Sequence, residues 1–155
     1  MSYLQDLSVF ALFGMADARV LAVGWLSSAH SYNRGEVSAE VFARICELLL
    51  DPWQPGTILG RHQCSLCRFT TGPSELVLRD NTTVSIGSRN LFVPAGDVLY
   101  VAPSMVAHYI DSHEYQPPDE FIAAIKECPP MRSVEYLRQM KHFGLHRVIR
   151  RGSKM

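Results

Sequence analysis

The middle third of the chain alternates short apolar runs with turn residues. Runs rich in β-branched and aromatic side chains are each bounded by Asp, Asn, Pro or Gly, a pattern typical of short strands joined by tight turns. The predicted strands span residues 75–79, 82–86, 90–93 and 98–101. Between the last two, Pro94 and Gly96 suit the second and fourth positions of a type I turn. Because consecutive strands with tight connections pair antiparallel, this region predicts a β-meander.

Hydrophobic residues recur at helical spacing on either side of these strands. The predicted helices span residues 38–50, 104–112, 118–127 and 133–143. Ser38 suits a helix N-cap, while Asp51-Pro52 and Pro117-Pro118 would end the first two helices. Nearer the N-terminus, the continuous apolar run of residues 20–26 favours a strand that is buried on both faces. The pattern therefore predicts an α+β fold, in which an antiparallel meander packs against helices.

Size and charge narrow the class of protein. The chain has 155 residues, 47% of them hydrophobic, which suits one core; we expect a single globular domain over residues 1–144 and a basic C-terminal tail at 145–155. Lys plus Arg and Asp plus Glu number 15 each, so no net field attracts nucleic acid or an anionic membrane. The apolar run at residues 9–13 is too short to span a bilayer and follows no positively charged leader, which predicts a soluble, cytoplasmic protein.

Candidate metal ligands lie in two clusters. Cys64 and Cys67 are separated by two residues and follow His62, a spacing that lets both sulfurs face one ion in a zinc-knuckle-like loop. His108 and His113 lie about forty residues further on and could complete the shell. Positions five apart on a helix differ by about 140°, so His113 is predicted to lie past the end of the helix that carries His108.

The cysteines allow other interpretations. Cys64 and Cys67 could form a redox dithiol, which would require a helix beginning at the first cysteine, or they could be free thiols in the core. Cys46 and Cys128 stand alone in apolar segments and are interpreted as small buried hydrophobes. No export signal accompanies the four cysteines, so reduced thiols or metal ligands are expected rather than disulfides.

A bound metal could be structural or catalytic. Five nearby candidate ligands are more than a tetrahedral site needs, which favours a closed, structural zinc site. A catalytic site would need a base such as Glu114 or Asp111, together with His30 and Tyr109. Asp111 could alternatively orient a ligating imidazole, although its position favours a carboxylate that faces solvent. The sequence has no H-E-x-x-H helix, nucleophile elbow or phosphate-binding glycine loop.

The chain resembles an uncharacterised family of bacterial domains of about this length. The resemblance rests on Gly60 to Cys67, on Leu91 to Pro94, and above all on the stretch from Tyr100 through His108-Tyr109-Ile110 and Pro117-Pro118 to Cys128-Pro129. It covers residues 23–144, whereas the basic tail departs from it. It implies that six side chains belong to one pattern, which adds Cys128 to the ligand candidates. These are His62, Cys64, Cys67, His108, His113 and Cys128. The resemblance brings no assigned activity.

These observations favour a zinc-stabilised binding or adaptor domain rather than an enzyme. Its loop at 27–35 and the aromatic region at 109–115 would meet a protein or small-molecule partner. The alternative is a zinc-dependent hydrolase with an open coordination site. Nucleic-acid binding through the tail at 145–155 is a third interpretation, which the neutral overall charge disfavours.

Overall fold

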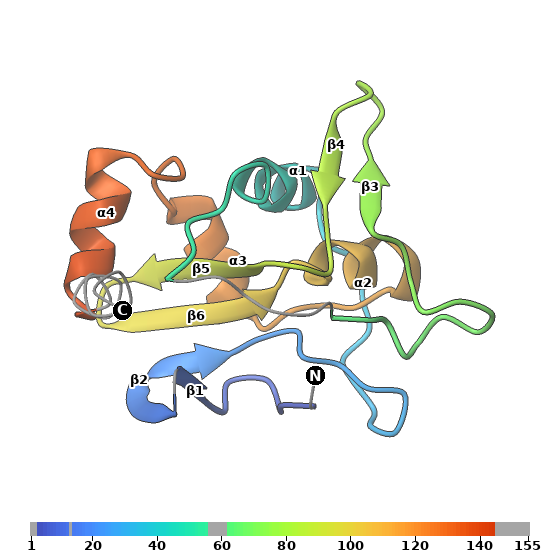
Figure 1. The fold of residues 1–155 in the computed structure, drawn as a ribbon, viewed down its shortest axis with the longest axis horizontal. Helices are drawn as coiled ribbons and strands as arrows, with labels where there is room; N and C mark the ends of the chain where they lie inside the picture. Colours follow the sequence, from blue (N-terminus) through green and yellow to red (C-terminus); the bar gives the residue numbers. More distant parts are fainter. Residues whose placement is uncertain (1–2, 13, 56–61, 145–155) are drawn as a thin grey trace, which may run out of the picture.

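The computed structural model describes residues 3–12, 14–55 and 62–144. The strands are β1 (Val9–Leu12), β2 (Met15–Ala22), β3 (Glu75–Val77), β4 (Thr83–Ser85), β5 (Asn90–Ala95) and β6 (Val98–Pro103). The helices are α1 (Ala39–Leu48), α2 (Val106–His113), α3 (Asp119–Glu127) and α4 (Val134–Lys141). This arrangement confirms the predicted α+β class (Figure 1). Gly60, Arg61 and the predicted tail lie outside the described residues.

The strands form two sheets rather than one continuous meander. The larger sheet has the order β1-β2-β6-β5, in which β2 and β6 are parallel and the other neighbours antiparallel. The hairpin β3-β4 forms its own two-stranded sheet. After β4 the backbone amides of Gly87 and Arg89 donate to the Ser104 hydroxyl, at 2.9 and 3.4 Å. Since these amides bond to a side chain, the connection turns away and β4 does not pair with β5.

The predicted type I turn at Pro94 is wrong. Pro94 and Ala95 belong to β5, and the chain reverses at Gly96 and Asp97, because Ala95 pairs with Val98. Gly96 has a φ of 63°, as tight hairpin turns require. Pro94 is tolerated inside a strand because β5 is at the edge of its sheet, where a missing amide donor costs no ladder bond.

The apolar run of residues 20–26 is only partly a strand. β2 begins earlier, at Met15, and ends at Ala22, although Val23 to Leu26 remain buried. Gly24 has a φ of 77°, and its amide donates to the Asp6 carboxylate at 2.9 Å. The Trp25 indole donates to the carbonyl of Val101 at 2.9 Å. Burial of this run is therefore confirmed, but after Ala22 its polar groups are satisfied outside a β-ladder.

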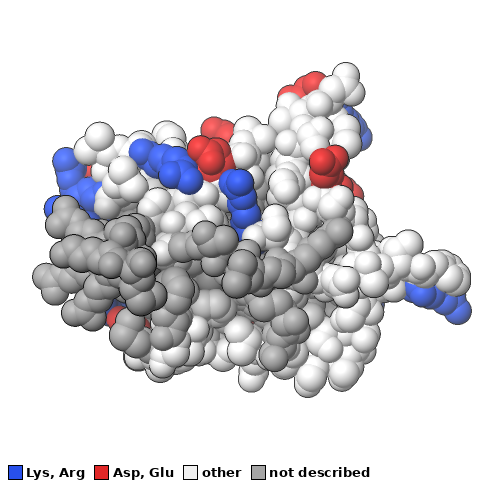
Figure 2. All heavy atoms as spheres, in the orientation of Figure 1, with Lys and Arg blue, Asp and Glu red and all other residues white. Residues whose placement is uncertain are grey.

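The helices cover the sheet in the way their caps and apolar faces predict. Ser38 and Ser133 accept hydrogen bonds from the amides of Val41 and Tyr136, at 3.2 and 3.1 Å. Helix α1 ends at Leu48, ahead of the predicted stop at Asp51-Pro52. Helices α3 and α4 pack on β5, while α1 packs on α2 and α3. The described face in Figure 2 carries basic and acidic side chains interspersed among uncharged ones.

The helices of the described part are also too short or too polar to cross a membrane.

Candidate metal centre

Cys64 and Cys67 lie in a loop that folds back on itself before β3. The amide of Cys64 donates to the carbonyl of Thr71 at 2.7 Å, which closes the loop. Gly72 has a φ of 92°, and a Cβ at this position would lie 2.7 Å from the Cβ of Cys64. Figure 1 shows this green loop projecting at the same end of the molecule as α2. We call residues 62–72 the knuckle loop.

Helix α2 presents both histidines to the knuckle loop. His108 lies in its first turn, and His113 is its last residue, so the prediction that His113 lies past the helix end is wrong. The two rings are perpendicular, with centroids 4.9 Å apart. Two imidazoles that start about 140° apart around the axis can thus reach one point, because the long side chains swing towards each other. Glu114 follows in a left-handed conformation, with a φ of 56°, and ends the helix.

Four potential ligand atoms meet between the loop and the helix. The Sγ of Cys67 lies 3.2 Å from Nε2 of His108 and 3.5 Å from Nε2 of His113. The Sγ of Cys64 lies 3.5 Å from Nε2 of His113. All four atoms lie within 4.8 Å of one another. Zinc bonds of about 2.3 Å to sulfur and 2.0 Å to nitrogen put S and N roughly 3.5 Å apart in a tetrahedron, so this cluster could hold a metal ion.

Burial favours the neutral form of both imidazoles in this cluster. It lowers the pKa of His108, with a further contribution from His113, and it lowers the pKa of His113, with a further contribution from Arg34. Burial also raises the pKa of Cys64 to about 11, against the opposing effect of hydrogen bonds from the Leu66 and Cys67 amides. Neutral imidazole is the metal-binding form of histidine, and a bound cation would favour the thiolate of cysteine.

Residues 2–126 match a family described as a domain of unknown function, DUF7919. The chain belongs to this family. All four residues of the cluster lie within the match, as do α2 and the knuckle loop. This membership agrees with the resemblance to an uncharacterised family. No curated protein and no solved structure matches the chain.

His62 does not belong to the four-atom group, although it lies behind it. Its Nε2 is 2.9 Å from the Tyr109 hydroxyl, and its ring stands edge-on to Trp25. Its Nδ1 is buried without a hydrogen-bond partner in the described part of the chain. Burial lowers the pKa of His62 to about 4. His62 is thus a neutral imidazole in the core of this DUF7919 protein, next to the four-residue cluster.

Cys128 also lies apart from the cluster. It caps the end of α3, two residues beyond the DUF7919 match, and its carbonyl accepts a hydrogen bond from Arg44. Burial raises the pKa of Cys128 and of Cys46 to about 11. The structure therefore brings together four of the six sequence candidates, and it leaves Cys128 and Cys46 as buried thiols. No described cysteine forms a disulfide.

The side chains considered for catalysis do not converge in the described structure. Asp111 is exposed, and Glu114 faces Arg34 at 3.8 Å with both side chains largely in solvent. His30 stacks on Tyr3 with ring centroids 3.7 Å apart. The residues after Cys64 form bends instead of a helix, so the helix expected of a redox dithiol is missing there.

Two contacts around the cluster are not predictable from the sequence. The Tyr32 hydroxyl donates to the carbonyl of His113 at 2.9 Å, and the Ser28 amide donates to the Ser65 hydroxyl at 3.0 Å. Both connect the loop at 27–35 to the cluster, across a sequence distance that periodicity cannot bridge. Gly72 was also missed, although the Gly72-Pro73 dipeptide is a turn signal.

Proposed function

We propose that this protein is a zinc-stabilised binding domain. Cys64, Cys67, His108 and His113 would hold one structural zinc ion, which fixes the knuckle loop to α2. The loop at 27–35, which rests on both, would carry the surface that meets a small-molecule or protein partner. The observation that carries this proposal is the meeting of four ligand atoms from two distant segments within 4.8 Å.

The donor set supports zinc over other biological cations. Two thiolates and two imidazoles match the preference of zinc for sulfur and nitrogen ligands, whereas magnesium and calcium prefer oxygen. Four protein ligands also close a tetrahedron, which is the usual arrangement of a structural site. When bound, zinc would bring two positive charges next to the two thiols and so favour their deprotonation.

The stabilisation expected from the ion is large for a domain of this size. Structural zinc contributes about 10 kcal/mol or more in favourable cases, similar to the net stability of a small domain, about 5–15 kcal/mol. His62 and Cys64 are buried at the base of the knuckle loop, but its outer part is short of core contacts, since Phe69 is 89% exposed and neighbouring residues form only bends. Its position against α2 would therefore depend on the metal.

Metal analysis of cysteine variants tests the proposal. The purified wild-type protein should contain one equivalent of zinc, and Co²⁺ substitution should give the visible absorption of a tetrahedral sulfur–nitrogen site. Cys67→Ser should lose the metal, because it removes a thiolate that faces both histidines. Cys128→Ser is the control: it changes a buried cysteine away from the cluster and should retain zinc.

The outcome also separates the two roles of a metal. Retention of stoichiometric zinc by both Cys67→Ser and His108→Ala would refute the ligand assignment. A metal-loaded protein whose Co²⁺ spectrum responds to added azide would have an open position, which would overturn the structural role in favour of the hydrolase alternative. Zinc-dependent unfolding together with an unresponsive spectrum is the result we expect.

A further inference from the structure

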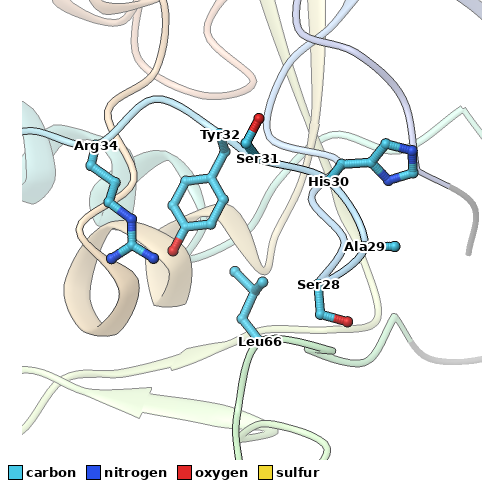
Figure 3. A pocket seen from close by; sticks show the side chains of 7 residues that line it. All are labelled: Ser28, Ala29, His30, Ser31, Tyr32, Arg34 and Leu66. Carbon is cyan, nitrogen blue, oxygen red and sulfur yellow. The ribbon is translucent and has the colours of Figure 1, made fainter.

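A cavity of about 390 Å³ lies beside the proposed zinc site, between the loop at 27–35 and Leu66 of the knuckle loop. Cavities of this size accept small ligands. Figure 3 shows Tyr32 and Arg34 extending from the loop towards Leu66, whereas His30 and Ser31 project in other directions. Ser28 borders the opposite side. The cavity is part of the proposed binding surface, and the residues that line it indicate which class of ligand it would bind.

Both walls of the cavity are tied to the metal cluster. One tie is the hydrogen bond from the Tyr32 hydroxyl to the carbonyl of His113, at 2.9 Å. The other is the bond from the Ser28 amide to the hydroxyl of Ser65, which lies between the two cysteines, at 3.0 Å. The cavity is therefore held open by the same segments that carry the four candidate ligands.

The chemistry of the lining favours an anion. Its charged residue is Arg34, and none of its residues is a carboxylate; His30 and Ser31 border it but project in other directions. The guanidinium of Arg34 lies 4.9 Å from the centre of the Tyr32 ring, which orients it as a flat donor surface. Glu114 is its carboxylate neighbour at 3.8 Å, beyond hydrogen-bond distance and largely exposed. Arg34 thus keeps donors available for an oxyanion, which guanidinium groups bind bidentately.

Apolar side chains line the rest of the cavity. Leu66 faces the Tyr32 ring across it, and Ala29 adds a methyl group to its border. A ligand would therefore need a short apolar or aromatic body in addition to its charge. An inorganic ion alone would leave these groups without a partner.

We propose that this cavity binds a small organic oxyanion, a carboxylate or a phosphate ester, through Arg34, with its apolar body between Tyr32 and Leu66. The inference rests on the proposed function, since the zinc-held knuckle loop forms one wall. Small organic oxyanions would then be the ligands that the binding domain recognises.

Titrations with simple probes test the inference on the zinc-loaded full chain. Benzoate and phenyl phosphate are added at constant ionic strength, and amide shifts are followed by NMR. One or both should give saturable shifts in residues 28–34 and 65–66, while neutral benzamide should give none. The relative affinities of the two anions identify carboxylate or phosphate as the preferred group.

Charge variants provide the controls. Arg34→Ala should weaken binding at least about tenfold, the loss expected for a charge-assisted hydrogen bond. Arg79→Ala removes an exposed arginine in the β3-β4 turn and should bind as the wild type does. Glu114→Gln should strengthen binding several-fold, because it removes the carboxylate that competes for Arg34.

Zinc content measured on the same samples separates the two proposals. Full zinc content without saturable anion binding would overturn the inference and leave the zinc proposal intact. Equal binding of benzamide and benzoate, or unchanged binding by Arg34→Ala, would overturn it as well. A wild-type protein without zinc would instead refute the proposed function.

Discussion

Replacing Gly72 with alanine tests whether the packing of the knuckle loop fixes the position of Cys64. The added Cβ would lie 2.7 Å from the Cβ of Cys64, whereas ordinary contact begins at 3.4 Å. Backbone atoms of Cys64 lie next to it, the nearest at 3.3 Å. Relief of the clash must therefore move the cysteine, since the neighbouring atoms are not the end of a flexible side chain.

The structure gives the size of the effect. Cys64 would shift by about 0.7 Å, several times the roughly 0.2 Å within which metal–ligand distances are held. Changes next to metal ligands typically reduce affinity about 10- to 100-fold, which corresponds to roughly 1.4–2.7 kcal/mol. We therefore expect the zinc affinity of Gly72→Ala to fall within this range.

The affinity can be measured by competition with a chromophoric chelator, with Gly96→Ala as the matched control. Gly96 also has a positive φ, of 63°, but a Cβ there would meet nothing within 4 Å. Both variants carry a backbone cost of about 1–2 kcal/mol, and only Gly72→Ala displaces a ligand. Equal zinc affinities for the two variants would refute the reasoning.

Three further predictions concern stability in urea. Tyr136→Phe should cost about 1 kcal/mol, because the buried hydroxyl donates to the carbonyl of Phe92 at 2.7 Å; an unchanged midpoint would contradict this. Ser38→Ala should also cost about 1 kcal/mol through loss of the cap on Val41, whereas Ser38→Asp should cost little. Burial lowers the pKa of His62 from 6.5 to about 4, so the unfolded chain binds a proton that the folded chain excludes. Stability should therefore fall as the pH drops through this window, by up to about 3 kcal/mol, and His62→Gln should flatten the profile relative to the wild type.

Local features of the fold were predictable from the sequence. Ser38 and Ser133 begin helices because a hydroxyl next to an amphipathic segment can satisfy its first amides. The hairpin strands were also recognisable from their β-branched runs. Each of these signals depends only on residues a few positions apart.

The partners of the strands were not predictable. β2 lies parallel to β6, a pairing between segments from opposite halves of the chain. β4 and β5 lie in different sheets, and in the connection between them the Gly87 amide donates a hydrogen bond to the hydroxyl of Ser104, 17 residues later in the chain. Neither contact leaves a periodic pattern, because both depend on tertiary packing.

The candidate site was predicted in composition but not in detail. The spacing of Cys64 and Cys67 identifies the loop, whereas the angular spacing of His108 and His113 on a helix does not reveal that the reach of their imidazole side chains lets both meet it. His62 precedes the pair at a favourable spacing, but its ring turns into the core, towards Tyr109. Side-chain direction in an irregular loop therefore decided which candidates meet.

The parallel pairing of β2 with β6 affects the rate of folding. The Trp25 indole and its acceptor Val101 are 76 residues apart in the chain, so the central sheet forms only after a long loop has closed. Closure of long loops is entropically unfavourable, and such topologies fold slowly. Cys67 and His108 are 41 residues apart. A bound ion would therefore close this loop first and reduce the length of chain that must still close to form the sheet. Refolding should accordingly be faster when zinc is present from the first millisecond than when it is added after collapse.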